Sequence, residues 1–409
     1  MKTASRACPI CSSSEVEVLH TQRFATPALS PLPAVSDVVA CPACGLVYAD
    51  TPVPQEGYDR YYAEFSKYED PTVATGGGAS PFDHLRLEDV ADELASRVSG
   101  EARVLDIGCA GGGLLAALHR RGFTHLHGVD AAAACVARVR SMGFPATCLP
   151  FSGLASLRNE GPFELVVLSH VLEHVVDLLP LVTAARSLIT PGGLLYVETP
   201  DASRYGEHEH VPFYFFDGEH INHFDTNRLA ALGEAVGLVT AGAGTRTFEV
   251  APGKTYPACW IFMGPGPSGD AGGTTRGITS LRDRVVDYVR RCRESRSFPQ
   301  LDLLAVAGTP VVVWGAGSFS QRLFGDGSLN GCHVVAVVDR DRNKQGRSFA
   351  GFIVEVPEAA LRRHPGAAVV VAAAIEETAI AMEARRLMDG GEVVTLTASR
   401  TSDSGGVGS

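Results

Sequence analysis

The sequence predicts an α/β protein that contains two Rossmann-like units behind a small cysteine-rich module. Residues 103–121, RVLDIGCAGGG followed by LLAALHRR, place a short apolar strand, a glycine turn and a helical pattern in succession. Strand and helix patterns then alternate to about residue 250, which is typical of a parallel sheet covered on both faces. A second strand, G-x-G turn and helix begin near Thr309, so the same unit is predicted twice.

Length and composition restrict the class of protein. A chain of 409 residues suggests roughly two or three domains, and 45% hydrophobic with 20% charged residues is typical of a soluble globular enzyme. The formal net charge of −11 opposes attraction to a polyphosphate backbone, so we expect no nucleic-acid partner. The N-terminus MKTASRACPICSSS has no apolar core of a signal peptide, and the chain has no apolar run of about eighteen residues. These observations predict a cytoplasmic protein with no membrane partner.

Four of the ten cysteines form two C-x-x-C pairs, Cys8 with Cys11 and Cys41 with Cys44. Each pair can direct two thiolates at one ion, and two such pairs supply the tetrahedral sulfur set that Zn²⁺ prefers. Four protein ligands leave no open position, which predicts a structural zinc in a module and lead-in at residues 1–75. Few basic residues surround the pairs, so a nucleic-acid-binding ribbon is the weaker interpretation.

The next part, residues 76–263, is the predicted cofactor domain. The crowded tyrosines of GYDRYYAEFSKYED, residues 57–70, precede it and are expected mainly to pack. TGGGAS at 75–80 is expected to be a flexible joint. The elements expected after it are helix 81–98, strand 103–107, helix 112–121, strand 125–129, helix 131–141, strand 163–169, helix 178–189, strand 193–198, helix 226–236 and strands 238–250 and 256–263.

Charge indicates which ligand the first glycine turn can hold. The carboxylate of Asp106, two residues before Gly108, would repel the pyrophosphate that a dinucleotide places against such a turn. The same carboxylate suits a cationic ligand, such as the sulfonium and ammonium groups of S-adenosylmethionine. The next strand ends at Asp130, where an acid can accept hydrogen bonds from both ribose hydroxyls.

These residues belong to an ordered set of motifs. D-x-G-x-A-x-G (Asp106, Gly108, Ala110 and Gly112), Asp130, FELVVLSHVLEH at 163–174 and PGGLLYVETP at 191–200 resemble the successive motifs of class I methyltransferases. The resemblance implies that these residues bind S-adenosylmethionine, with Ser169 and His170 flanking the cofactor. Ala110 stands where the family usually has glycine, and no acid follows the third strand near residues 149–152.

Two segments at the carboxyl ends of the predicted strands offer titratable side chains. SHVLEHVVD places His170 and His174 four residues apart, a spacing that could hold a metal but lacks an obvious third ligand. The stretch DASRYGEHEHVPFYFFDGEHINHFD, residues 201–225, has no periodicity and is too aromatic for disorder, which favours a functional loop. His220 and Glu219 in it are predicted to be a base and an orienting acid, although Glu219 could instead bond local backbone.

Residues 264–308 are predicted to be a linker and a connecting helix from 278 to about 295. Residues 309–400 form the predicted C-terminal Rossmann-like domain, and residues 401–409 a disordered tail. In the C-terminal domain the turn at Gly315 and Gly317 has no acid before it, so a phosphate is acceptable there, although Ser320 replaces the third glycine. A substrate-phosphate site or a duplicated scaffold is therefore favoured over a working dinucleotide site.

The order of these parts resembles the three-part sugar C-methyltransferases of bacterial deoxysugar pathways over nearly the whole chain. The resemblance implies a nucleotide-linked 4-keto-sugar as substrate, a C-terminal unit that helps to hold its nucleotide part, and a histidine that removes the proton beside the ketone. By motif, Glu219 and His220 match the family's E-H pair, His174 matches the histidine after the fourth motif strand, and Tyr68 matches a pocket tyrosine. Asp217 departs from the tyrosine that the family often has at this position.

A histidine is suited to this chemistry because its unperturbed pKa lies near neutrality. The function predicted is S-adenosylmethionine-dependent C-methylation of a keto-deoxysugar, as in antibiotic or glycan biosynthesis, by a monomer or weak homodimer. The alternative enzyme is an O- or N-methyltransferase of a sugar, nucleoside or antibiotic intermediate, with His220 still the base. The alternative outside enzymes is a binding protein with an inert methyltransferase fold.

Overall fold

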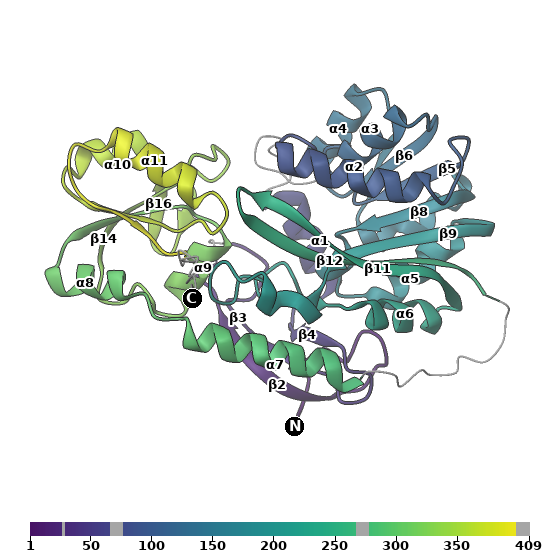
Figure 1. Cartoon of the computed structure of the whole chain (residues 1–409), viewed down its shortest axis with the longest axis horizontal. Helices are drawn as coiled ribbons and strands as arrows, with labels where there is room; N and C mark the ends of the chain where they lie inside the picture. Colours follow the sequence, from purple (N-terminus) through teal and green to yellow (C-terminus); the bar gives the residue numbers. More distant parts are fainter. Residues whose placement is uncertain (27–28, 66–76, 267–277, 398–409) are drawn as a thin grey trace, which may run out of the picture. The chain divides into compact units, whose positions relative to one another are not determined.

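The computed structural model describes residues 1–26, 29–65, 77–266 and 278–397 and divides the chain into two compact units (Figure 1). The first comprises residues 1–208 and 215–291, and the second comprises residues 209–214 and 292–409. The first unit thus includes both the cysteine-rich module and the predicted cofactor domain, and the domain boundaries stay a prediction. Tyr68, the first residues of the glycine joint and the tail from 401 lie outside the described residues.

The N-terminal module is built on an antiparallel sheet whose last strand comes from a distant part of the chain. Its order is β1 (Lys2–Thr3), β2 (Glu15–Arg23), β3 (Val35–Ala40), β4 (Val47–Asp50) and β10 (Asn222–His223). In the last pair, Asn222 is opposite Tyr48 and His223 is opposite Val47. Because β10 begins two residues after His220, the cysteine-rich module holds one end of the predicted catalytic loop.

The second sheet of this unit is the predicted cofactor core. Its order is β11 (Leu238–Ala251), β12 (Lys254–Pro265), β9 (Ile189–Pro200), β8 (Phe163–Ser169), β5 (Arg103–Ile107), β6 (His125–Asp130) and β7 (Ala146–Cys148). The strands from β9 to β7 are parallel, whereas β11 and β12 are antiparallel. The parallel strands end at one edge of the sheet, where open α/β sheets bind their ligands.

Helices cover both faces of this sheet (Figure 1). One face carries α2 (Pro81–Ala95), α3 (Gly113–Arg120) and α4 (Ala133–Ser141), and the other carries α5 (Leu178–Ser187) and α6 (Thr226–Ala235). Successive residues of β5 alternate between the faces, since Val104 packs in the cluster of the first helices and Leu105 in that of the second. The predicted order of elements and the Rossmann-like fold are confirmed.

The remaining helices of the first unit are short or lie outside the core. They are α1 (Gln55–Glu64), α7 (Ile278–Glu294) and the 3₁₀ segments η2 (Phe151–Asn159), η3 (Leu172–His174) and η4 (Ala202–Glu207). The predicted irregular stretch 201–225 therefore holds only η4 and β10 as regular structure. Asp225 ends the stretch by accepting the backbone N–H of Arg228 at the start of α6.

The second unit contains its own largely parallel sheet. The strand order is β15 (Ser348–Phe349), β16 (Phe352–Glu355), β14 (His333–Val338), β13 (Pro310–Trp314), β17 (Ala368–Val371) and β18 (Val393–Thr395). Its helices are α8 (Pro299–Ala307), α9 (Ser318–Gly325), α10 (Pro357–Arg363) and α11 (Glu377–Leu387). Helix α8 falls in the segment predicted as linker and buries Leu301 and Leu304 in the core of this unit. Across the ranges that the structure describes, no helix has the length and apolarity needed to cross a membrane.

Candidate methyltransferase site

The glycine turn between β5 and α3 adopts backbone conformations that explain its composition. Gly108 and Gly112 have φ of +78° and +80°, in the left-handed region that favours glycine. A Cβ on Gly108 would lie 2.6 Å from Cγ2 of Val171, so the turn also touches the segment that follows β8. Ala110 has φ of +44°, which shows why glycine is the usual residue of the family at this position.

Two carboxylates lie at this turn. Asp130 accepts the backbone N–H of Ala110 on Oδ2 at 2.9 Å and that of Ala132 on Oδ1 at 2.8 Å. Asp106 is buried, and burial together with the charge of Asp130 raises its pKa to about 7. Burial also raises the pKa of Asp130. A positively charged ligand would favour the ionised form of both groups, which fits the donor-rich, cationic methionine end and the ribose hydroxyls of S-adenosylmethionine.

Ser169 and His170, predicted to flank the cofactor, follow directly at the end of β8. His170 has φ of +56°, and its ring lies between two buried acids: Nδ1 is 3.1 Å from Oε1 of Glu173, and Nε2 is 3.5 Å from Oε1 of Glu198. Burial opposes protonation of His170, but the two carboxylates outweigh it and raise the pKa of the ring. The imidazole is therefore fixed from both sides beside the cofactor turn.

Glu198, near the end of β9, was not predicted as a site residue. Its side chain is completely buried, yet it lies 3.0 Å from Nε of Arg246 and accepts the hydroxyl of Tyr196 at 2.8 Å. Burial alone would raise the pKa of Glu198, but His170, Arg246 and Arg86 together lower it to about 2. This buried anion holds His170 in place, and its partners come from segments that give no local signal in the sequence.

The predicted catalytic histidines meet in space. The ring centroids of His174 and His220 are 4.7 Å apart. His174 Nδ1 lies 2.7 Å from the hydroxyl of Tyr62 and 3.1 Å from the backbone carbonyl oxygen of Glu219. Burial lowers the pKa of His174, against the opposing effect of Glu173, so the neutral ring is favoured.

The carboxylate of Glu219 bonds to a tyrosine. Its Oε1 accepts the hydroxyl of Tyr61 at 2.7 Å. Tyr61 and Tyr62 both lie on α1, in the tyrosine-rich segment that was expected mainly to pack. Two hydroxyls of that segment thus reach site residues, whereas Tyr68, the tyrosine named from the resemblance, lies outside the described residues.

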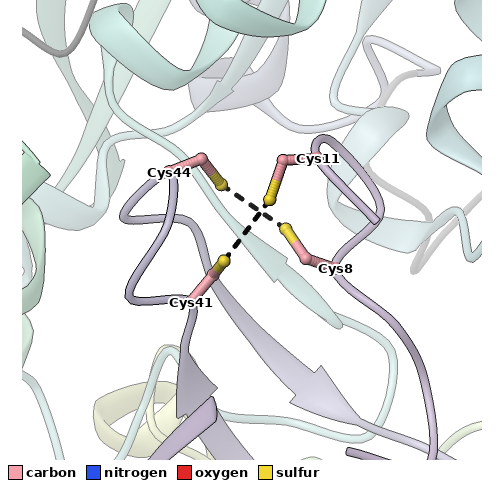
Figure 2. A group of neighbouring side chains, drawn as sticks. All are labelled: Cys8, Cys11, Cys41 and Cys44. Carbon is pink, nitrogen blue, oxygen red and sulfur yellow. Dashed lines mark hydrogen bonds between the residues drawn. The ribbon is translucent and has the colours of Figure 1, made fainter. Parts of the chain in front are cut away.

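The cysteine cluster forms as the spacing predicts. The four sulfur atoms of Cys8, Cys11, Cys41 and Cys44 converge from two knuckles and lie within 4.8 Å of one another (Figure 2). The contacts Cys8–Cys44 and Cys11–Cys41 measure 3.4 and 3.5 Å, close to the separation of about 3.8 Å that follows from tetrahedral Zn–S bonds of about 2.3 Å. The donor set therefore fits a structural zinc ion.

Arg6, two residues before the first knuckle cysteine, links this cluster to the segments that carry the predicted catalytic histidines. Its buried guanidinium donates to the carbonyl oxygen of Val176 at 2.5 Å and to Oδ1 of Asn222 at 3.0 Å. Asn222 in turn donates to the carbonyl oxygens of Leu172 and Val175, each at 2.7 Å. The module therefore supports the backbone on both sides of the His174 and His220 pair.

A family of proteins described as "Methyltransferase domain" matches residues 82–241, which contain the glycine turn, both aspartates and the two histidines. The first unit therefore contains a class I S-adenosylmethionine-dependent methyltransferase domain, and the predicted enzyme class is confirmed.

Curated relatives share this domain. The chain is 33% identical over 114 residues to a ubiquinone biosynthesis O-methyltransferase of Xylella fastidiosa, which covers 26% of this chain and 46% of the relative. A protein of the same name from Bordetella avium is 34% identical over 121 residues, which cover 28% of this chain and 48% of the relative. The chain thus spans about half the length of the curated relatives that it matches.

The chain also aligns with methyltransferases and other proteins of known structure. PH0226 protein from Pyrococcus horikoshii aligns with a TM-score of 0.39 and 16% identity over 49% of this chain and 99% of that chain. The Burkholderia thailandensis 1,6-didemethyltoxoflavin-N1-methyltransferase aligns with a TM-score of 0.38 and 15% identity over 54% of this chain and 95% of that chain.

Proposed function

We propose that the chain transfers a methyl group from S-adenosylmethionine to carbon, most specifically to the carbon beside the ketone of a nucleotide-linked keto-deoxysugar. The observation that carries the proposal is the pair His174 and His220 next to the cofactor turn. Val171 contacts the turn at Gly108, and His174 follows it by three residues. A base at this position can act on an acceptor that lies over the cofactor methyl group.

Different residues of the cofactor site are proposed to bind different parts of S-adenosylmethionine. Asp106 supplies negative charge for the methionine end, Asp130 retains lone pairs for the ribose hydroxyls, and His170 is fixed between Glu173 and Glu198. When bound, S-adenosylmethionine supplies a methyl group already activated by its sulfonium. The protein then has to generate the nucleophile and hold it in line with that methyl group.

His220 is the proposed general base. Its Nδ1 is buried and has no hydrogen-bond partner among the described residues, so its lone pair can accept a proton. His174, whose Nδ1 is tied to Tyr62 and to the carbonyl of Glu219, is placed to hold the neighbouring ring and is the second candidate for the base. Glu219, bonded to Tyr61, orients the acceptor pocket in this proposal. Removal of the proton beside a ketone leaves an enolate whose carbon attacks the methyl group.

The C-terminal unit is proposed to hold the nucleotide part of the substrate. Its turn from Gly315 to Gly317 leads into α9, and Gly315 has φ of +120°. Asp339, at the end of the next strand, accepts the backbone N–H of Ala316 on Oδ2 at 2.8 Å. The arrangement repeats that of Asp130 and Ala110 and supports a nucleotide ligand. The N–H groups of Gly315 and Ala316 donate within the protein, so the phosphate is proposed to lie at the start of α9, after Gly317.

O-methylation is the second candidate, because the relatives of the domain are named O-methyltransferases. His220 would then take the proton of a hydroxyl group. Incubation of the protein with S-adenosylmethionine and a nucleotide-linked 4-keto-deoxysugar, followed by NMR of the product, separates the candidates. A new methyl group on the carbon beside the ketone is the expected result. A methyl group on oxygen or nitrogen would favour the second candidate, and cofactor binding without transfer to any such acceptor would favour a binding protein.

A further inference from the structure

We propose that Glu173, His174 and His220 form a binding site for a divalent transition-metal cation, distinct from the four-cysteine cluster, and that a cation bound there inhibits methyl transfer. One ligand atom of each residue lies within 4.8 Å of those of the other two. Ligand atoms of a tetrahedral site with bonds of about 2.0 Å are about 3.3 Å apart, so modest side-chain rotations close the distance.

Glu173 and His220 each have a buried side-chain atom without a hydrogen-bond partner among the described residues. Glu173 has 1% of its surface exposed, and its Oε2 is buried without a hydrogen-bond partner among the residues that the structure describes. The same holds for Nδ1 of His220. A buried carboxylate oxygen and a buried imidazole nitrogen without partners are costly unless a ligand satisfies them. Because one ligand atom of Glu173 and one of His220 lie within 4.8 Å of each other, a single cation can accept lone pairs from both residues.

Neighbouring groups orient the side chains of His174 and Glu173, as hydrogen-bond partners around a metal site orient its ligands. Nδ1 of His174 faces the carbonyl oxygen of Glu219 at 3.1 Å, so an N–H at Nδ1 can donate to it and leave the Nε2 lone pair available. That Nε2 is 3.9 Å from Oε1 of Glu173. Oε1 of Glu173 is also 3.1 Å from Nδ1 of His170, which orients the carboxylate. Ligating histidines and carboxylates are commonly held by such second contacts.

The donor set selects the kind of cation. Two imidazole nitrogens and one carboxylate oxygen suit Zn²⁺, Co²⁺, Ni²⁺ or Fe²⁺, whereas Mg²⁺ and Ca²⁺ prefer oxygen ligands. Three protein ligands leave coordination positions for water or an acceptor group, unlike the closed cysteine cluster.

Inhibition of methyl transfer follows from the number of protons on the His220 ring, and this step rests on the proposed function. A neutral imidazole has one proton, so a His220 ring bound to a metal through Nδ1 must keep that proton on Nε2. Neither nitrogen can then accept a proton from the methyl acceptor. The cation would therefore stop base catalysis without displacing S-adenosylmethionine, whose proposed contacts are Asp106 and Asp130.

The test is a Co²⁺ titration of the full-length chain, dialysed beforehand against a mild chelator that leaves the cysteine-bound zinc. The expected result is one additional equivalent of Co²⁺ with a visible spectrum lacking sulfur-to-cobalt charge transfer, absent from His220→Gln and retained in the surface control His125→Gln. No additional equivalent, or an equivalent that His220→Gln retains, would overturn the site.

Activity measurements separate this proposal from the proposed function. Methyl transfer by the dialysed wild type should fall at least tenfold on saturation with Co²⁺ or Zn²⁺ and recover with chelator, while cofactor affinity stays unchanged. Transfer that is unaffected or raised by the bound cation overturns the inhibitory role. A cation bound as expected to a dialysed protein that methylates no acceptor would instead leave the site standing and count against the proposed function.

Discussion

The carboxylate of Asp217 accepts the backbone N–H of His220 at 2.7 Å, and the same oxygen accepts that of Glu219 at 3.0 Å. A side chain that bonds the backbone two and three residues on closes a local turn without any regular structure. The backbone of Glu219 and His220 is therefore fixed by Asp217. Asp217 contributes to the site by positioning its neighbours.

Replacement of Asp217 should test this positioning role. Asp217→Ala removes the acceptor for both N–H groups and should lower kcat by roughly tenfold or more, since small misplacements of a catalytic group are costly. Asp217→Asn keeps a carbonyl oxygen and should retain most of the activity. Steady-state kinetics of both variants, with cofactor affinity as control, distinguish the roles. Equal losses in the two variants would show that the negative charge matters more than the turn.

The pKa of Asp106 predicts a pH dependence of cofactor binding. The ligand-free carboxyl titrates at about pH 7, and only its ionised form attracts the cationic methionine end. As the pH falls below 7, one proton must leave for each ligand bound, so affinity should decrease by up to about tenfold per pH unit. Calorimetric titration with S-adenosylmethionine from pH 5.5 to 8 measures this. Asp106→Asn should bind weakly and lack that component of the pH dependence, and wild-type affinity in this variant would contradict the assignment.

The raised pKa of Asp106 also predicts how the thermal stability of Asp106→Asn depends on pH. The pKa of Asp106 in the folded protein lies above the ordinary carboxyl value of 3.8. Between these values the folded state binds more protons than the unfolded state, so it loses stability as the pH rises through this window. Above pH 7 the buried charge opposes folding of the ligand-free protein. The Tm of ligand-free Asp106→Asn should therefore exceed that of the wild type at pH 8, and the two should converge toward pH 4. A lower Tm at pH 8 would show that the carboxylate is stabilised by contacts other than a ligand.

Zinc should be present at the four-cysteine cluster. Its loss should also affect β10, the last strand of the same sheet, which begins two residues after His220. After dialysis against a mild chelator, elemental analysis is expected to find one Zn²⁺ per chain, and Cys41→Ser should lower the folding yield. Because β10 pairs with β4, loss of the ion should also reduce turnover. Ser187→Ala, a change at an exposed residue of α5 whose hydroxyl, among the described residues, bonds only the carbonyl oxygen of Ala184, serves as a control. A metal-free chain with the Tm and activity of the wild type would refute this prediction.

The sequence indicated the turn of the methyltransferase domain and its two aspartates because these residues follow local rules. Asp106 and Asp130 stand at the ends of short apolar strands, and glycines mark the turn between strand and helix. Such signals depend on neighbours in the chain. The same rules predicted the two cysteine knuckles and the alternation of strands and helices along the Rossmann-like core.

Other parts of the site were less predictable because they are assembled from distant segments. Glu198 resembles any strand residue in YVETP, and its role depends on Arg86 and Arg246. The hydroxyls of Tyr61 and Tyr62 reach Glu219 and His174 across more than a hundred residues of chain, so periodicity could not separate them from packing tyrosines. The helix α8 was missed because Pro299 at its start resembles the end of a linker.

In the proposed reaction, His220 removes a proton from the carbon that receives the methyl group. The most direct measurement is NMR of solvent deuterium exchange into a nucleotide-linked 4-keto-deoxysugar, with an unreactive cofactor analogue bound and chelator present. The wild type should exchange the proton beside the ketone, whereas His220→Gln, with unchanged cofactor affinity, should exchange it roughly a hundredfold more slowly. Full exchange by the variant would transfer the role to another base, with His174 first, and an absence of exchange in the wild type would contradict C-methylation.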